Sequence, residues 1–166
     1  MNALKNNIEI FINILEKAKD KDYPIILSGS TSLALQGVDI EVHDIDIVTD
    51  KKGALALDNL LKDFSQIEMK YSSTDKYQSY FGSYNIDNTK VEVMGEFQYK
   101  LKNGKWSIPN HLHDIYYIDY NGIKIPVLSL SQELIEYQNS NKTNTINKIQ
   151  ERLCKKNKEY NNFVLF

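Results

Sequence analysis

The sequence predicts an α/β (α+β) domain, in which a sheet of short strands is flanked by helices. Short apolar segments alternate with helical patterns as far as residue 64. Segments of β-prone residues separated by turn signals then follow over residues 66–127, and two helical patterns come after them. A chain of 166 residues can bury a substantial core as one domain, so we expect a single domain.

The composition is that of an ordinary globular protein. Hydrophobic residues make up 42% of the chain, charged residues 25%, and the net charge of −2 gives no general reason to expect nucleic-acid binding, although a local basic groove is compatible with it. The single cysteine, Cys154, excludes a disulfide framework within the chain. We expect a cytoplasmic protein without a membrane partner, because no apolar run is long enough to span a bilayer and no signal-peptide core is present.

The first half of the chain alternates between helices and strands. Residues 3–20 and 53–64 carry apolar side chains at helical spacing, and residues 25–27 and 43–49 are expected to form strands. A short helix is predicted over residues 30–36, with Ser30 as its N-cap and Gly37 just after its end. In the strand over 43–49, His43 should face the core together with Ile45.

The second half is predicted to contain hairpins and then helices. A strand over 66–71 precedes a hairpin of residues 77–86 and 90–94, which turns at Asp87–Asn88. Two peripheral hairpins are expected, one pairing 97–101 with 106–108 and one pairing 115–120 with 123–127. Helices should follow over about 129–137, capped by Ser129 or Ser131, and over about 142–156. We therefore divide the domain into a core at about 24–95, hairpins at about 96–128 and C-terminal helices at about 129–157.

Asp44 and Asp46 are the first candidate metal ligands. They lie two residues apart in a predicted strand, so both carboxylates project from the same face. Paired carboxylates suit Mg²⁺, which takes its remaining ligands from water and substrate phosphates. The alternative is an ordinary strand with aspartates on its solvent face.

Two further features strengthen this interpretation. Gly29 and Ser30 form a turn at the start of a predicted helix, where backbone N–H groups favour anions such as phosphates. Glu92 is a lone acid on a strand whose other face carries Val91 and Val93, and it could complete a cluster of three carboxylates. Each feature also has an ordinary structural interpretation, as a helix junction and as an exposed strand residue.

Taken together, these motifs resemble the nucleotidyltransferase superfamily typified by DNA polymerase beta, and most closely its small, uncharacterised minimal prokaryotic members. The resemblance is carried by three motifs: the Gly-Ser turn and following helix at 29–37, Glu41-Val-His-Asp-Ile-Asp-Ile47, and Val91-Glu-Val-Met-Gly95. It extends from about Pro24 to Ser131. The third acid is Glu rather than Asp, which departs from the superfamily pattern. The resemblance implies a central mixed β-sheet flanked by helices, with extra hairpins and a short C-terminal helical segment.

The resemblance also implies an activity. A nucleoside monophosphate, AMP by expectation, would be transferred from an NTP to an acceptor with release of pyrophosphate. Asp44, Asp46 and Glu92 would be the catalytic residues and would hold two Mg²⁺ ions (or Mn²⁺), and Glu92 could act as general base. Gly29 and Ser30 would bind the β- and γ-phosphates of the NTP, with ATP as the expected nucleotide.

The acceptor and the partners stay open at this point. A small molecule such as an antibiotic, a protein or an RNA could be the acceptor, and a homodimer or a toxin–antitoxin partner is compatible with the sequence. The first alternative function is a non-catalytic nucleotide-binding or toxin–antitoxin interaction module that retains the fold. A metal-dependent nuclease is the second, although the Gly-Ser turn favours triphosphate binding. Tyr77, Tyr80 and Tyr84 are candidates for stacking on a nucleobase.

Overall fold

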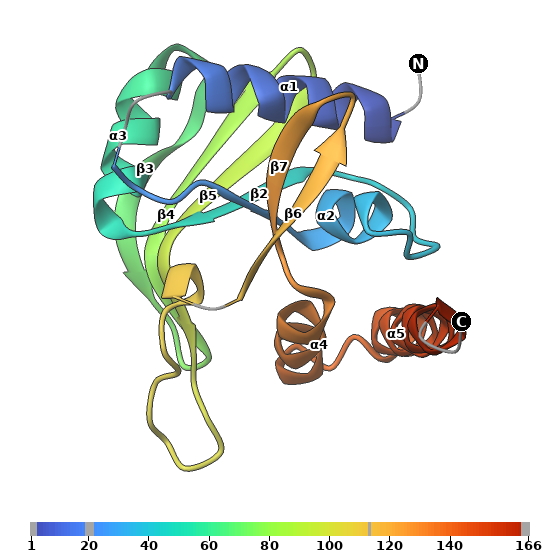
Figure 1. Ribbon diagram of the computed structural model, residues 1–166. Helices are drawn as coiled ribbons and strands as arrows, with labels where there is room; N and C mark the ends of the chain where they lie inside the picture. The colour runs from blue at the N-terminus through green and yellow to red at the C-terminus, as the bar shows by residue number, and fades with distance from the viewer. Residues whose placement is uncertain (1–2, 19–21, 113, 164–166) are drawn as a thin grey trace.

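The computed structural model describes residues 3–18, 22–112 and 114–163. In this part of the chain a seven-stranded sheet has the order β3-β4-β5-β2-β1-β7-β6, with helices packed on it (Figure 1). The strands are β1 Ile26–Ser28, β2 Ile45–Thr49, β3 Ser65–Ser73, β4 Tyr77–Ile86, β5 Thr89–Tyr99, β6 Ile115–Tyr120 and β7 Ile123–Leu128. The helices are α1 Ala3–Lys17, α2 Gly29–Leu35, α3 Lys51–Leu61, α4 Leu130–Asn139 and α5 Thr143–Phe163, with short 3-10 turns η1 Lys62–Phe64 and η2 Asn110–Leu112.

The sheet is mixed, as predicted. Strand β2 pairs in parallel with β5, and β1 pairs in parallel with β7, while the remaining neighbours are antiparallel. The tight turn between β4 and β5 has positive φ angles of 50° at Asp87 and 62° at Asn88, the conformation that short hairpins favour. This turn therefore confirms the predicted hairpin.

The main core lies between one face of the sheet and the helices α1 and α3. Apolar residues of β2 and β5, including Ile45, Ile47, Val91 and Val93, are fully buried there against both helices. Because side chains alternate along a strand, the residues between them face the opposite side of the sheet. That opposite face carries the candidate site.

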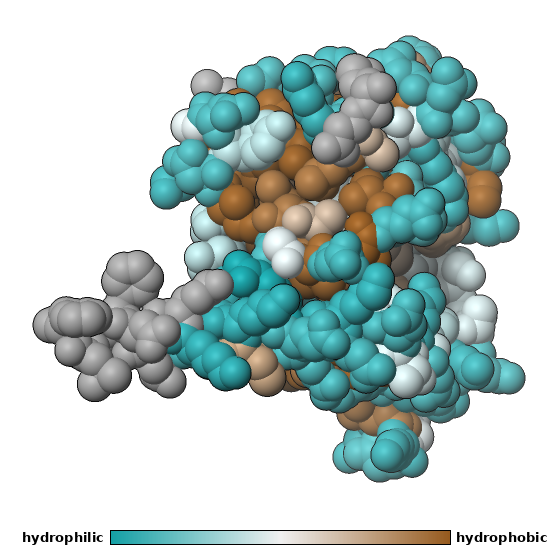
Figure 2. Space-filling view, turned by 90° about the vertical axis from the view of Figure 1, so that its right-hand side faces the viewer, coloured by the Kyte–Doolittle hydropathy of each residue, from teal (hydrophilic) through white to brown (hydrophobic). Residues whose placement is uncertain are grey.

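The C-terminal helices form a smaller layer on the site's side of the sheet. Helices α4 and α5 pack against each other and against α2, with Leu33, Leu130 and Ile149 buried between them. Seen from the right-hand side of Figure 1, apolar side chains gather in the upper half of the surface, whereas the lower half, where α4 and α5 lie, is mostly hydrophilic (Figure 2). No helix in the described ranges combines the length and the apolar character that a membrane span requires.

Three local predictions differ from the structure in whole or in part. The hairpin expected to be peripheral at 115–127 belongs to the main sheet, because β7 pairs with β1 at Leu27 and Val127. The hairpin expected at 97–101 and 106–108 is confirmed in part: β5 continues to Tyr99, and the two arms then pair through one isolated antiparallel bridge between Lys100 and Trp106. Helix α2 begins at Gly29, one residue before Ser30, so Ser30 is not its N-cap.

Two capping predictions are confirmed. The Ser129 side chain accepts a hydrogen bond from the N–H of Gln132 and caps α4, which decides between Ser129 and Ser131. Gly37, with a φ of 82°, follows the end of α2, where its left-handed conformation favours glycine.

Candidate active site

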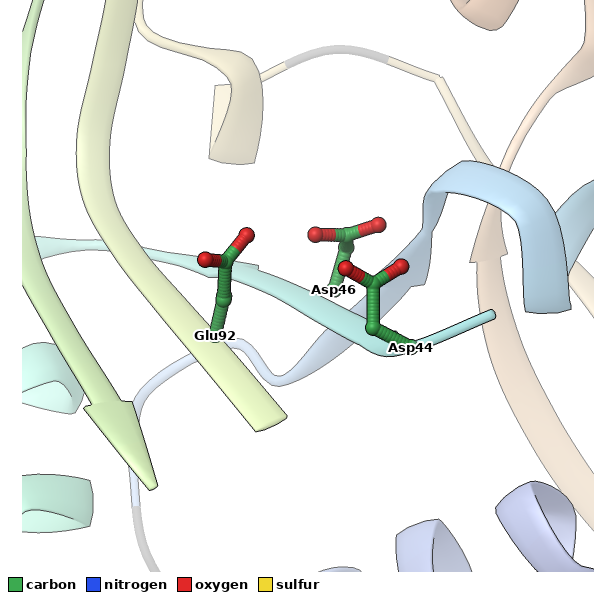
Figure 3. Close-up of side chains that lie close together, drawn as sticks. All are labelled: Asp44, Asp46 and Glu92. Carbon is green, nitrogen blue, oxygen red and sulfur yellow. The ribbon is translucent and has the colours of Figure 1, made fainter. Parts of the chain in front are cut away.

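The three predicted carboxylates lie close together at one end of the paired strands β2 and β5. Asp46 lies directly opposite Glu92 in the parallel register, and Asp44 stands one residue before β2 begins. One carboxylate oxygen from each of the three residues lies within 4.8 Å of the others. Figure 3 shows the side chains pointing toward a common space from the two strands. Oxygen ligands at this spacing suit a hard divalent cation such as Mg²⁺ or Mn²⁺.

Lys90 also belongs to this group of side chains. Its Nζ lies 2.5 Å from Glu92 Oε1 and 3.8 Å from Asp44 Oδ2. Lys90 and Glu92 are two residues apart on β5, so period-two alternation was a signal that could have placed them on one face. The ammonium group thus bridges two of the three acids.

The electrostatics of Asp46 show that this site carries excess negative charge. Burial, and then the neighbouring carboxylates of Asp44 and Glu92, raise the pKa of Asp46 to about 8, against the opposing effect of Lys90 and Lys142. Ionising Asp46 beside the other two carboxylates is therefore unfavourable without additional positive charge. A divalent cation bound between them would supply that charge, so the residues present fit a metal ion.

The first residue of α2, Gly29, lies very close to Asp46. Gly29 has a φ of 67°, and a Cβ at this position would lie 2.0 Å from Asp46 Oδ2. Any side chain here would therefore displace the Asp46 carboxylate as well as strain the backbone. Glycine is required because of both the conformation and the contact.

Ser30 and His43 are placed differently from expectation. The Ser30 hydroxyl accepts a hydrogen bond of 3.1 Å from the backbone N–H of His43 and so ties α2 to the segment before β2. The side chain of His43 is exposed, so the expectation that it faces the core is wrong. The reason is that β2 begins only at Ile45, so the alternation of the strand does not extend to residue 43.

A cavity of about 530 Å³ begins at Asp46, which is the one of the three candidate metal ligands that lines it. Gly29 and Asp46 line it at the end nearest the candidate metal site, and aromatic residues of β4 and β5 line it further away. The rings of Tyr77 and Phe97 stack there with their centroids 5.6 Å apart. Its size is typical of small-molecule sites.

The three tyrosines that were candidates for stacking on a nucleobase lie in three different environments. Tyr77 lines the cavity. Tyr80 instead contacts the ring of Tyr71 and the ammonium group of Lys51. Tyr84 is fully buried, and its hydroxyl donates a hydrogen bond to Asp58 Oδ1 at 2.8 Å. Of the three, Tyr77 is the one on the wall of the cavity.

Helix α4 contributes two further acids, Glu133 and Glu136, to the wall of the cavity. Glu133 is only 1% exposed, and its Oε1 accepts a hydrogen bond of 3.0 Å from the N–H of Gly29. Burial and the neighbouring Glu136 raise the pKa of Glu133, although hydrogen bonds from Ser32 and Gly29 act in the opposite direction. Burial likewise raises the pKa of Glu136 to about 7. Sequence reasoning missed both residues, and their three-residue spacing on a predicted helix was the only local signal.

Comparisons with known proteins agree with this arrangement. The family model described as aminoglycoside-2''-adenylyltransferase matches residues 10–152, and the chain belongs to this family. One solved structure is that of TM1012 from Thermotoga maritima, described as a candidate nucleotidyltransferase. It shares 34% sequence identity with this chain and superposes with a TM-score of 0.75, and the match covers 91% of this chain and 94% of TM1012. The predicted membership of the nucleotidyltransferase superfamily and the predicted fold class are thereby confirmed.

A more distant structure shares the fold. The lincomycin-bound lincosamide antibiotic adenylyltransferase LnuA is 14% identical, with a TM-score of 0.57, and the match covers 88% of this chain and 96% of LnuA. A search among curated proteins found no match. The family and these structural relatives support a nucleotidyltransferase as the kind of enzyme.

Proposed function

We propose that the protein transfers AMP from ATP to a hydroxyl-bearing acceptor and releases pyrophosphate, with Asp44, Asp46 and Glu92 as the catalytic residues. The observation that carries the proposal is the placing of all three carboxylates within 4.8 Å, beside a glycine turn that touches Asp46. This arrangement supports the catalytic proposal over a non-catalytic module that keeps only the fold.

Asp44, Asp46 and Glu92 would hold two Mg²⁺ ions, which supply charge neutralisation at the triphosphate. The acceptor oxygen attacks the α-phosphorus, and the bond between that phosphorus and the bridging oxygen of the β-phosphate breaks. Glu92 takes the proton of the acceptor hydroxyl, and pyrophosphate leaves with the electron pair of the broken bond. The residues of the protein act mainly by positioning and by balancing charge.

The Gly29–Ser30 turn would receive the β- and γ-phosphates. The Ser30 hydroxyl already accepts a bond from His43, and its own hydrogen stays available to donate to a phosphate oxygen. The N–H of Gly29 is bound to Glu133, so phosphate binding at this group requires that bond to be exchanged. Lys90 and Lys142 lie close enough to influence the charge of Asp46 and would balance the triphosphate.

The cavity would hold the nucleobase against Tyr77 and the acceptor against α4. The carboxylates of Glu133 and Glu136 favour an acceptor that carries an amino group as well as a hydroxyl group. This fits the family description, which names an aminoglycoside, and LnuA, whose acceptor is a lincosamide. Both compound classes belong in the first acceptor screen, followed by protein and RNA from a cell extract.

The direct test uses ATP labelled either at the α-phosphate or at the γ-phosphate, with Mg²⁺ and the acceptor panel. We expect label to move to an acceptor from α-labelled ATP alone, with stoichiometric pyrophosphate release. The Asp44→Asn, Asp46→Asn double variant should bind no Mg²⁺–ATP and transfer no label while keeping its fold by circular dichroism. Failure to transfer label from any of the four NTPs would favour the non-catalytic module instead.

A further inference from the structure

The backbone of Asp44 lies outside the sheet ladder and is held by other means. Pairing between β2 and β5 begins at Ile45, so the carbonyl oxygen of Asp44 lies before the first paired residue. The hydroxyl of Thr31 donates to that carbonyl oxygen at 2.6 Å. The side-chain amide of Asn7 also lies within hydrogen-bonding distance of it, at 3.4 Å. Two side chains from different helices therefore converge on this one backbone oxygen.

Asn7 and Thr31 also bind each other. Asn7 Nδ2 donates to Thr31 Oγ1 at 3.0 Å, and both residues are buried, with exposed fractions of 2% and 0%. Asn7 stands on the buried side of α1 next to Ile8 and Phe11, where an apolar residue would be the usual choice. A buried amide is costly unless it is hydrogen-bonded, and here its hydrogen bonds lead to Asp44.

A second contact fixes the other side of the same segment. The N–H of His43 donates to the Ser30 hydroxyl, so consecutive residues of α2, Ser30 and Thr31, bind consecutive residues of the segment before β2. The direction in which the Asp44 carboxylate points depends on the backbone orientation that these bonds set. Asp46, by contrast, is held by the sheet itself through its pairing with Glu92 and Ser28.

We propose that Thr31 and Asn7 are positioning residues, which hold the backbone of Asp44 so that its carboxylate meets those of Asp46 and Glu92. This inference rests on the proposed function, since it assigns Asp44 to a metal site. Partners that orient metal ligands commonly change metal affinity by about 10- to 100-fold when they are removed. Loss of the Thr31 hydroxyl should therefore weaken metal binding more than its effect on folding would suggest.

The chain offers a closely matched control in Thr49. It is also fully buried, lies at the other end of β2, and its hydroxyl also donates to a backbone carbonyl, that of Pro24. Thr31→Val and Thr49→Val thus remove the same kind of buried hydrogen bond and keep the same side-chain shape. Thr31→Ser restores the hydroxyl and should restore metal affinity.

The experiment measures Mn²⁺ binding to the full chain by isothermal titration calorimetry, with thermal unfolding recorded for each variant. We expect Thr31→Val to weaken Mn²⁺ binding about tenfold or more, while Thr31→Ser and Thr49→Val bind Mn²⁺ as the wild type does. Unchanged affinity in Thr31→Val, or an equal loss in Thr49→Val, overturns the positioning role and leaves the proposed function standing. If the wild type binds no Mn²⁺, the proposed function and this inference both fall. If Thr31→Val does not fold, Asn7→Ala decides by the same criteria.

Discussion

Two groups of acids meet at one cavity, which is lined by Asp46 from the first group and by Glu133 and Glu136 from the second, and the two groups are supported in different ways. Asp44, Asp46 and Glu92 project from neighbouring strands, repel one another and have Lys90 as their nearest cation. Glu133 on α4 is deeply buried but accepts hydrogen bonds from Gly29 and Ser32. The first group therefore needs added positive charge, whereas Glu133 of the second group is held by hydrogen-bond donors of the protein, although burial still raises its pKa. Local support, and not the number of carboxylates, is thus the difference between the candidate metal site and the acids of α4.

The largest expected effect follows from Glu92→Gln. If Glu92 is the general base, its amide replacement should lower kcat by about 10²- to 10⁴-fold and change the Kd for Mg²⁺–ATP much less. Glu96→Gln, on the same strand and near Lys51, is the matched control and should keep its activity. Steady-state kinetics measures kcat, and isothermal titration calorimetry measures the Kd for Mg²⁺–ATP. An unaltered kcat in Glu92→Gln would remove Glu92 from the chemistry.

Glu133→Gln tests the second group. Because Glu133 accepts a hydrogen bond from the N–H of Gly29 beside the phosphate turn, its carboxylate would repel the phosphates of ATP whenever it is ionised. Glu133→Gln removes that charge and should tighten ATP binding about five- to tenfold at a pH at which Glu133 is ionised, which corresponds to about 1 kcal/mol. Glu136→Gln removes a charge one turn along α4 without contacting Gly29, so its effect on ATP should be smaller. Loss of Mn²⁺ binding in Glu133→Gln would show instead that the two groups act as one site.

Tyr77→Leu tests the aromatic wall of the cavity. If its ring stacks on the nucleobase, the Kd for ATP should rise about three- to tenfold, and Mn²⁺ affinity should stay unchanged. Tyr80→Leu, on the same strand but packed against Tyr71 away from the cavity, should leave ATP binding as it is. Equal effects of the two substitutions would point to damage of β4 rather than to stacking.

The smallest effect concerns stability. The pKa of Asp46 is raised to about 8, so the metal-free folded protein retains a proton there that the unfolded chain loses near pH 4. Folding stability from this group is thus present below about pH 4 and is lost as the pH rises toward 8.

Asp46→Asn should consequently melt about 4 °C higher than the wild type at pH 8 without metal, and the difference should vanish near pH 4. Adding Mn²⁺ should stabilise the wild type and not the variant. The exposed Asp63→Asn serves as the control in the same melting experiments. A variant that is less stable than the wild type at pH 8 would contradict the charge repulsion described for this site.

Local patterns were sufficient to predict the parts of the site that depend on one strand or one turn. Alternation predicted Asp44 and Asp46 on one face, although Asp44 lies just before β2, and the resemblance to known nucleotidyltransferases joined them to Glu92. The contacts that sequence could not supply are those between distant segments. Glu133 reaches Gly29 across 104 residues, and no periodicity encodes that approach. The same limit explains why the hairpin at 115–127 was expected outside the sheet.

The pairing of β1 with β7 has a consequence for how the chain folds. Strand β1, which carries the Gly29 turn at its end, lies between β2 and a strand that is synthesised about one hundred residues later. A fragment that stops near residue 95 would contain every proposed catalytic residue but would leave β1 as an open edge, prone to pair with other chains. Contacts so distant along the chain form slowly. On the ribosome, the nascent chain would therefore keep this edge of β1 open until β7 has emerged from the exit tunnel.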